Sequence, residues 1–321
     1  MAVWLRSARK FRRCSLMNFP NKQIWARANA SAGTATRVLT AAVLIPAVVA
    51  LVWWGSTWLV AALGGLVALL ALREFFSLGG RLNLQGYRWW TSLCALWIFF
   101  QQWSVSAAQS YQVGRNLRLT QAPALVPELP LELVFFVFLL GCAATVFALR
   151  RPLTDALGDI GISSAGLVFI VLPLSAVVRI HALDVLGPKL LLFALLLVWV
   201  GDTLAYFVGR SFGRMPMAAQ LSPKKTWEGA AANLLGSAIV GVALFGWLNI
   251  DAFQAVLMAC LANVAGQAGD LLKSAYKRGA GVKDSGTLLP GHGGILDRID
   301  ALILAAPVVW YYFRFLLASR F

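Results

Sequence analysis

The residues of this sequence that could do chemistry gather near its C-terminal end. Asp270, Ser274 and Lys277 are spaced i, i+4 and i+7, and Arg278 follows at once. On a helix this spacing places the first three side chains in one stripe. An ionised carboxylate inside an apolar segment is costly unless it is paired, hydrated or bound to an ion. Asp270 is therefore a candidate for catalysis or metal binding.

A glycine-rich stretch, 279–296, leads from this stripe to a second pair of acids. It holds six glycines, and at that density backbone N–H groups can approach an anion closely. Asp297 and Asp300 follow, with Arg298 between them, and fall on one face of the next predicted helix. Carboxylates beside a basic, glycine-rich segment suit Mg²⁺ when the ion must also hold phosphate oxygens. The alternative is a flexible, positively charged loop.

A second basic group of residues lies upstream, in the segment 209–229. Ser222 precedes Pro223, the order typical of a helix N-cap and first helical position, and Lys224 and Lys225 follow. The pattern predicts a helix that begins at Ser222 and directs its N-terminus and both lysines at one place. Helix N-termini bind phosphate. The alternative is an ordinary basic loop on the inner side of a membrane.

The composition identifies the chain as a membrane protein. It is 60% hydrophobic and only 13% charged, and its four cysteines have no spacing typical of a disulfide framework or a zinc site. The formal net charge of +15 would indicate nucleic acid in a soluble domain, but its distribution does not. Residues 1–37 hold eight basic residues and no acid, which is typical of a cytoplasmic segment attracted to anionic lipid. An organelle transit peptide is the alternative for this segment.

Nine apolar segments are candidates to cross a bilayer whose apolar core is about 30 Å thick. They are 38–54, 57–72, 89–103, 133–149, 161–178, 190–208, 230–248, 252–272 and 299–317. The longer polar connection 104–132 is interpreted as a loop. The expected fold is an all-α, polytopic bundle of about nine transmembrane helices.

The distribution of basic residues sets the orientation of the bundle. With the N-terminus in the cytoplasm, 22 of the 28 Lys and Arg residues lie on the inner side. The reverse orientation would place most of them outside, against the positive-inside bias. Asp202, Asp270, Asp297 and Asp300 then all lie toward the cytoplasmic ends of their spans. A shared polar cavity explains this better than separate structural ion pairs.

The same stretches resemble the phosphatidate cytidylyltransferases, also called CDP-diacylglycerol synthases. The resemblance rests on Ser274-x-x-Lys277-Arg278-x4-Lys283-Asp284, which continues through Pro290-Gly291-His292-Gly293-Gly294-x-x-Asp297-Arg298-x-Asp300. Upstream blocks, Asp202-x-x-Ala205-Tyr206-x-x-Gly209-Arg210 and Ser222 through Gly229, are also similar to the family. Leu272-Lys273 departs from the family, in which an aromatic residue and a glutamate are common there. Leu204 also departs, since glycine is frequent at that position.

The resemblance implies roles for individual residues. Catalytic roles fall to Asp270, Asp297, Lys277, Arg278 and His292. The phosphates of CTP and phosphatidate would be bound by Ser222, Lys224, Lys225, Ser274, Lys283 and Arg298. Asp270, Asp297 and Asp300 would hold Mg²⁺, with K⁺ left open as a second cation. The roles of Asp202, Asp284 and His292 are not determined by the sequence.

The expected function is transfer of the cytidylyl group of CTP to phosphatidate, which gives CDP-diacylglycerol and diphosphate in phospholipid synthesis. A CTP-dependent lipid kinase, an ether-lipid CDP-synthase of the same superfamily and an ion-coupled transporter are the alternatives.

We expect a basic cytoplasmic extension over 1–36 and a transmembrane domain over 37–321, with its catalytic half at about 195–321. The expected location is a bacterial inner membrane with the site facing the cytoplasm. Membrane lipids are expected partners, nucleic acid is not, and a homodimer is left open.

Overall fold

A computed structural model describes residues 34–113, 129–149, 153–183, 185–286, 288 and 293–317. The described chain is almost entirely helical, which confirms the predicted all-α class. Its elements are α3 (Thr34–Trp54), α4 (Thr57–Gly80), α5 (Arg88–Val113), α6 (Leu131–Leu149), α7 (Leu153–Gly166), a π-helical turn η2 (Leu167–Val171), α8 (Leu172–His181), α9 (Leu186–Phe212), β1 (Pro216–Ala218), β2 (Ser222–Thr226), α10 (Trp227–Leu248), α11 (Ala252–Gly279), α12 (Leu296–Tyr312) and a second π-helical turn η3 (Phe313–Leu317).

Each of the nine predicted apolar segments coincides with a helix or with a continuous helical rod. Among the described residues, six of these are long and apolar enough to cross a membrane: Thr57–Gly80, Leu153–His181, Leu186–Phe212, Trp227–Leu248, Ala252–Gly279 and Leu296–Leu317. Apolar stretches of α3 and α6 are shorter, and α5 is too polar to meet the same requirement. The chain therefore has the features of a multi-pass membrane protein.

Helix α5 is longer than the sequence indicated. The apolar run ended at 103, but the helix continues to Val113, so the first part of the predicted loop 104–132 is wrong. Polar residues interrupt the hydrophobic pattern there, yet Gln101, Ser104 and Ser106 are buried in the fold. The Gln101 amide donates to the Leu129 carbonyl (3.0 Å). Tertiary contacts therefore satisfy polar groups that a hydropathy pattern assigns to a loop.

A short antiparallel hairpin, β1 and β2, lies between α9 and α10. The predicted helix start at Ser222 is therefore wrong, because Ser222 pairs with Ala218 in the hairpin. Helix α10 begins at Trp227, and its N-cap is Thr226, four residues after Ser222; the Thr226 hydroxyl accepts from the Gly229 N–H (3.2 Å). Thr226 is the last residue of β2, and its hydroxyl reaches the free N–H of Gly229, the third residue of α10, so the helix is capped there and not at Ser222.

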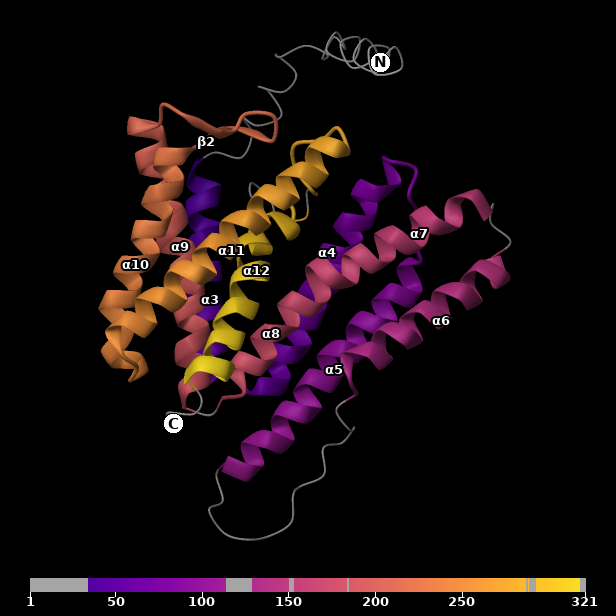
Figure 1. Cartoon of the computed structure of the whole chain (residues 1–321), viewed down its shortest axis with the longest axis horizontal. Coiled ribbons are helices and arrows are strands. Elements are labelled where there is room, and N and C mark those ends of the chain that lie inside the picture. Colours follow the sequence, from indigo (N-terminus) through magenta and orange to yellow (C-terminus); the bar gives the residue numbers. More distant parts are fainter. Residues whose placement is uncertain are drawn as a thin grey trace, which may run out of the picture.

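The helices pack around two apolar cores (Figure 1). One core is formed mainly by α9, α11 and the C-terminal part of α12, and the other mainly by α4, α5, η2 and α8. Helix α12 contributes to both, through Ala305 to the first and Ile303 to the second. The β hairpin, the end of α11 and the end of α4 lie at the same, upper end of the bundle in Figure 1. The predicted functional residues that the structure describes lie toward this end.

Candidate active site

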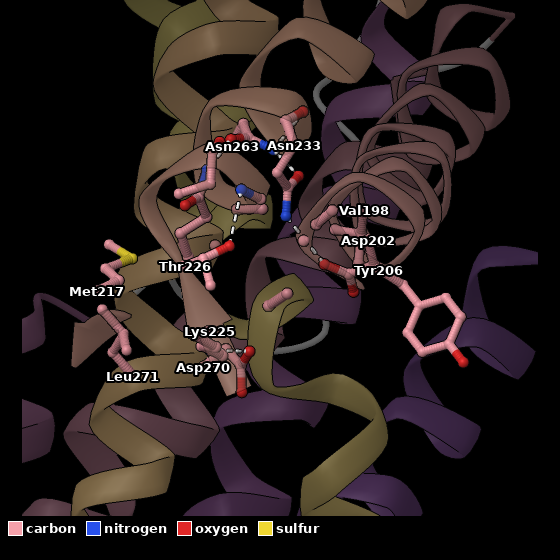
Figure 2. A pocket seen from close by; sticks show the side chains of 18 of the residues that line it. Val198, Asp202, Tyr206, Met217, Lys225, Thr226, Asn233, Asn263, Asp270 and Leu271 are labelled. Carbon is pink, nitrogen blue, oxygen red and sulfur yellow. Dashed lines mark hydrogen bonds and ion pairs between the residues drawn. The ribbon is translucent and has the colours of Figure 1, made fainter. Parts of the chain in front are cut away.

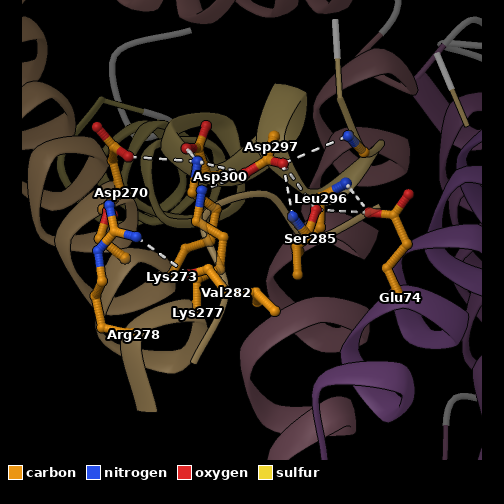
Figure 3. Close-up of polar contacts among 12 residues, drawn as sticks. Glu74, Asp270, Lys273, Lys277, Arg278, Val282, Ser285, Leu296, Asp297 and Asp300 are labelled. Carbon is orange, nitrogen blue, oxygen red and sulfur yellow. Dashed lines mark hydrogen bonds and ion pairs between the residues drawn. The ribbon is translucent and has the colours of Figure 1, made fainter. Parts of the chain in front are cut away.

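Charged side chains from three elements meet at the upper end of the bundle. Figure 3 shows those of α11 and α12, and Figure 2 shows Lys225 of β2 beside Asp270. Strand β2 contributes one lysine, α11 one aspartate and two lysines, and α12 two aspartates. We call them the ion-pair cluster: Lys225, Asp270, Lys273, Lys277, Asp297 and Asp300. The cluster holds three carboxylates and three ammonium groups, so its formal charge is zero. The stripe predicted on α11 and the paired acids predicted on α12 thus face one another.

Lys273 is the centre of the ion-pair cluster. Its ammonium lies 3.4 Å from Asp270 Oδ1 and 3.3 Å from Asp297 Oδ1, and it donates a hydrogen bond to Asp300. Only 10% of its side chain is exposed. In the sequence, Lys273 is marked only by its departure from the family pattern. Its position at i+3 from Asp270, on nearly the same helix face, was the signal that could have placed it in the site.

The cluster has an open end and a closed end. At the open end Lys225 donates to Asp270, and about 30% of each side chain is exposed. At the closed end the Lys277 ammonium donates to Asp297 Oδ1 at 2.7 Å, and only 9% of the Asp297 side chain is exposed. A ligand that approaches the cluster therefore meets Lys225 and Asp270 first.

Asp270, Asp297 and Asp300 have the oxygen donors that Mg²⁺ prefers. Their arrangement does not form a metal site by itself, because all three are directed at the Lys273 ammonium. Among the residues that the structure describes, no group of three or more Asp, Glu, His or Cys side chains is placed to hold a metal ion. The donor chemistry fits a divalent cation, whereas the geometry as it stands fits an ammonium group.

Asp297 also fastens the glycine-rich segment. Its Oδ2 accepts from the Ser285 N–H (3.0 Å), the Ser285 hydroxyl (2.9 Å) and, more weakly, the Gly294 N–H (3.4 Å). The backbone has a positive φ at Gly293, +79°, a conformation that favours glycine. Asp297 therefore joins two ends of this segment to the lysines of α11.

A carboxylate that the sequence analysis missed, Glu74 of α4, binds the same segment from the opposite side (Figure 3). It accepts from the Ser285 hydroxyl (2.8 Å), the Ile295 N–H (2.9 Å) and the Leu296 N–H (3.0 Å). A Cβ at Gly294 would lie 2.2 Å from Glu74 Oε2, so this glycine is needed for the close approach. Glu74 is buried at the N-terminus of α12, where the helix dipole favours a negative charge. The available signal was an acid at the end of an apolar run.

A cavity of about 270 Å³ opens beside the cluster, between α9, α10 and α11 (Figure 2). Lys224, Lys225 and Asp270 line it near the cluster, and Asp202 lines it on α9. A row of polar side chains, two of them buried and one half-buried, lies along its wall. We call it the amide chain: Asn233 of α10 with Asn263 and Gln267 of α11. No role was predicted for these neutral residues from the sequence, although Asn263, Gln267 and Asp270 continue the helical stripe toward the bilayer.

The remaining predicted site residues are not members of the ion-pair cluster. The Ser274 hydroxyl donates to the Asp270 carbonyl of its own helix (2.8 Å). Arg278 donates to the carbonyls of Leu221 (3.0 Å) and Val282 (3.1 Å), and so ties the hairpin turn to the segment after α11. Lys283 and Arg298 are exposed near the cluster's closed end. Ser222 is a strand residue, and His292 lies outside the described residues.

Comparison with curated proteins gives several relatives. A Haemophilus influenzae protein named phosphatidate cytidylyltransferase is 42% identical over 139 residues, which cover 41% of this chain and 48% of the relative. A Bacillus subtilis protein of the same name is 34% identical over 183 residues, covering 56% of this chain and 67% of the relative. An Escherichia coli protein called uncharacterized protein YnbB is 43% identical over 130 residues, or 40% and 44% of the two chains. The match thus spans about half the length of the first and third relatives.

The sequence profile described as the cytidylyltransferase family matches residues 35–316. This range includes both apolar cores except Leu317, the cavity and every member of the ion-pair cluster. The chain belongs to the cytidylyltransferase family.

Proposed function

We propose that the chain transfers the cytidylyl group of CTP to phosphatidate and releases diphosphate. Family membership supports this proposal, as do the names of the Haemophilus and Bacillus relatives. The observation that carries it is the open end of the ion-pair cluster, where Lys225 and Asp270 line the same cavity as Lys224. Two lysines beside a carboxylate at the mouth of a cavity suit a polyphosphate at the membrane surface.

In the proposed reaction a non-bridging oxygen of the phosphatidate phosphate attacks the α-phosphorus of CTP. The new bond joins that oxygen to the α-phosphorus, and the bond between the α-phosphorus and the bridging oxygen breaks. Diphosphate leaves with the electron pair. The second pKa of a phosphate monoester is about 6, so the attacking oxygen is already mostly ionised and needs no strong general base. The task of the protein is to bring two anions together and align them.

The lysines carry this task in the proposal. Lys224 and Lys225 bind phosphates at the cavity mouth. Lys277 extends the positive charge from there to the glycine-rich segment, where Lys283 lies, and to Arg298 at the start of α12. The triphosphate competes with Asp270 for Lys225, which is the more exposed of the paired lysines. Arg278 positions the hairpin through its two backbone contacts. Ser222 and Ser274 are proposed to bind phosphate, and His292 is proposed as a catalytic residue.

Mg²⁺ is proposed as the cofactor because the nearby carboxylates supply the oxygen donors that this ion prefers. Asp270, Asp297 and Asp300 would hold it together with phosphate oxygens, after Lys273 has moved away. The bound ion would neutralise charge on the triphosphate and on the leaving diphosphate. K⁺ is proposed as an optional second cation, and a homodimer as the assembly.

The topology is proposed to be nine crossings with the N-terminus in the cytoplasm and the site on the cytoplasmic side of a bacterial inner membrane. The 22 basic residues on one side support this orientation. The test uses a variant without the four native cysteines, in which a cysteine replaces Asp284 or Val185. Both positions are exposed, and they lie at opposite ends of the bundle. Asp284→Cys should react with a membrane-impermeant thiol reagent only in opened cells, and Val185→Cys in sealed cells. Reaction of Asp284→Cys in sealed cells would contradict the orientation.

The reaction itself is tested with CTP labelled on either the α- or the γ-phosphate. With phosphatidate and Mg²⁺, the α-label should move into the chloroform-soluble lipid, and the γ-label should appear in aqueous diphosphate. A CTP-dependent lipid kinase would give γ-label in the lipid and would require a hydroxyl acceptor with a general base. Transfer of γ-label to lipid would contradict cytidylyl transfer. Replacing phosphatidate with its ether-linked form tests the related synthase reaction.

A further inference from the structure

The amide chain beside the cavity is a directed series of hydrogen bonds that ends on Asp202 (Figure 2). Gln267 Nε2 donates to Asn263 Oδ1 at 2.6 Å. Asn263 Nδ2 donates to Asn233 Oδ1 at 2.5 Å, and Asn233 Nδ2 donates to Asp202 Oδ1 at 3.1 Å. Three amides from α10 and α11 thus point their donors in one direction, toward a carboxylate on α9.

One backbone contact fixes this direction. Gln267 Nε2 also lies 3.2 Å from the Ala230 carbonyl, which can only accept a hydrogen bond. The amide nitrogen of Gln267 must therefore face Ala230 and Asn263. Each following amide then has its oxygen toward the previous residue and its nitrogen toward the next. The chain cannot be reversed without leaving the Ala230 carbonyl facing an amide oxygen, so Asp202 receives a donor and not an acceptor.

Asp202 is placed to accept a second hydrogen bond from a ligand. Its Oδ1 is taken by Asn233, and within the described part of the chain no protein donor is in hydrogen-bond contact with Oδ2. The Asp202 side chain lines the cavity that Lys224 and Lys225 line near the cluster. Burying an amide inside a membrane protein lowers the free energy of unfolding unless the amide is hydrogen-bonded, so such residues usually have a structural or functional role. An amide chain that served only to join helices would have no need to end on an acid open to the cavity.

We propose that Asp202 recognises the exocyclic amino group of the cytosine base, and that the amide chain holds its carboxylate in place for this contact. The inference rests on the proposed function and assigns the base of the nucleotide to this cavity, with the phosphates at the lysines. Cytosine presents an N–H₂ donor where uracil presents a carbonyl acceptor, and an acidic side chain accepts from the former. A carboxylate facing the uracil oxygen leaves two acceptors in contact. Asp202 is thus a specificity-determining residue that selects CTP over UTP.

Because the direction of the hydrogen bonds in the amide chain is fixed, the structure predicts whether a substitution at Asp202 raises or lowers the preference for CTP. In Asp202→Asn the new amide must turn its oxygen toward Asn233 Nδ2, and its nitrogen then faces the base. The substitution converts an acceptor at the base into a donor and retains nearly the same volume. We expect the ratio of kcat/KM for CTP over UTP to fall at least about tenfold, because a site built around one hydrogen bond rejects the analogue that lacks it. Asp202→Ala, with neither donor nor acceptor, should also lower the ratio, but less.

The experiment measures transfer from CTP and from UTP to phosphatidate by the full chain in lipid–detergent micelles. Asp251→Asn is the matched control, because Asp251 caps α11 at the opposite end of the bundle and asparagine caps a helix equally well. Where turnover of a variant is too low to measure, the nucleotide concentrations that give half-maximal thermal stabilisation replace kcat/KM. A ratio within about twofold of the unmodified chain in both Asp202 variants would overturn the inference and leave the proposed function intact. No transfer from CTP by the unmodified chain would overturn the proposed function and this inference with it.

Discussion

The ion-pair cluster and the amide chain occupy the same stripe of α11 but use different chemistry. Asn263, Gln267, Asp270, Ser274 and Lys277 are spaced four, three, four and three residues apart, over about 21 Å of helix. The two residues deeper in the bundle are neutral amides, whereas Asp270 and Lys277, nearer the end of the helix, are charged and flank the neutral Ser274. Each amide is hydrogen-bonded to another side chain, whereas each charge is paired with an opposite charge.

The difference follows from the cost of burial. An unpaired ion in an apolar interior is far more costly than an unpaired amide, so buried charges need complete pairing. The cluster meets this condition by matching three carboxylates with three ammonium groups. Removal of one member leaves a buried charge without its partner, whereas removal of Asn263 or Gln267 from the amide chain leaves only neutral groups unsatisfied. The two regions should therefore respond differently to substitution.

The largest effect is expected for Asp297→Asn. This substitution leaves Lys277 and Lys273 with less negative charge in a site that is mostly closed to water. Transfer of α-label from CTP to lipid should fall by roughly 10³-fold, because the charge balance that positions both phosphates is lost. Asp270→Asn should have a similar effect on turnover and a smaller effect on thermal stability, since Asp270 is the more exposed acid.

Asp251→Asn is the control for both variants and should retain normal activity. Membrane insertion is followed by fractionation, and folding by the thermal midpoint in micelles. Near-normal turnover of Asp297→Asn, at limiting as well as saturating Mg²⁺, would mean that the acids of the cluster are structural.

A smaller effect is expected for Glu74→Gln. The glutamine retains one acceptor oxygen, but its amide nitrogen faces a backbone N–H of Ile295 or Leu296. An unmade hydrogen bond of this kind costs about 1–3 kcal/mol, and movement of the segment that Asp297 holds should lower turnover by roughly 10- to 100-fold. Glu132→Gln, an exposed acid in the first turn of α6, is the control. Full activity and an unchanged thermal midpoint would show that Glu74 does not position the segment.

The next effect concerns stability and its dependence on Mg²⁺. Lys273→Gln removes the ammonium that three carboxylates share, so their mutual repulsion should lower the thermal midpoint by several degrees, on the order of 1–2 kcal/mol. Added Mg²⁺ should raise the midpoint of this variant more than that of the unmodified chain, because the carboxylates then have a vacancy for a cation. Arg81→Gln, an exposed cation after α4, is the control. An equal response to Mg²⁺ in the variant and the unmodified chain would contradict a shared role of Lys273.

The smallest effect on turnover is expected for Asn263→Leu, which interrupts the amide chain. Gln267, Asn233 and Ser237 each lose a neutral partner, and the free energy of unfolding should fall by about 1–3 kcal/mol. Transfer from CTP should stay within about tenfold of normal, since no charge is left unpaired. Val264→Leu, on the exposed side of the same helix, controls for added volume. A loss of turnover as large as that of Asp297→Asn would erase the distinction between the two regions.

The sequence predicted the parts of the fold that depend on local pattern. Apolar runs located all nine helical segments, because the cost of exposing a polar backbone or side chain to lipid acts residue by residue. The 3.6-residue period placed Asp270, Ser274 and Lys277 on one face of α11 and Asp297 with Asp300 on one face of α12. The extent of α5 was not predictable in this way, since Gln101 and Ser104 are polar residues whose burial depends on neighbouring helices.

The sequence by itself determined that this is a helical membrane chain with its acids and lysines gathered at one end. Only the tertiary structure decided which charge pairs with which. Glu74 meets the N-terminus of α12 across 222 residues of sequence, and Lys225 meets Asp270 because a hairpin, and not a helix, holds the lysine. Hydropathy and helical period act over a few turns, whereas the partner of a buried charge is set by how helices pack. That packing brings Lys273, a residue of no evident importance in the sequence, to the point where three carboxylates converge.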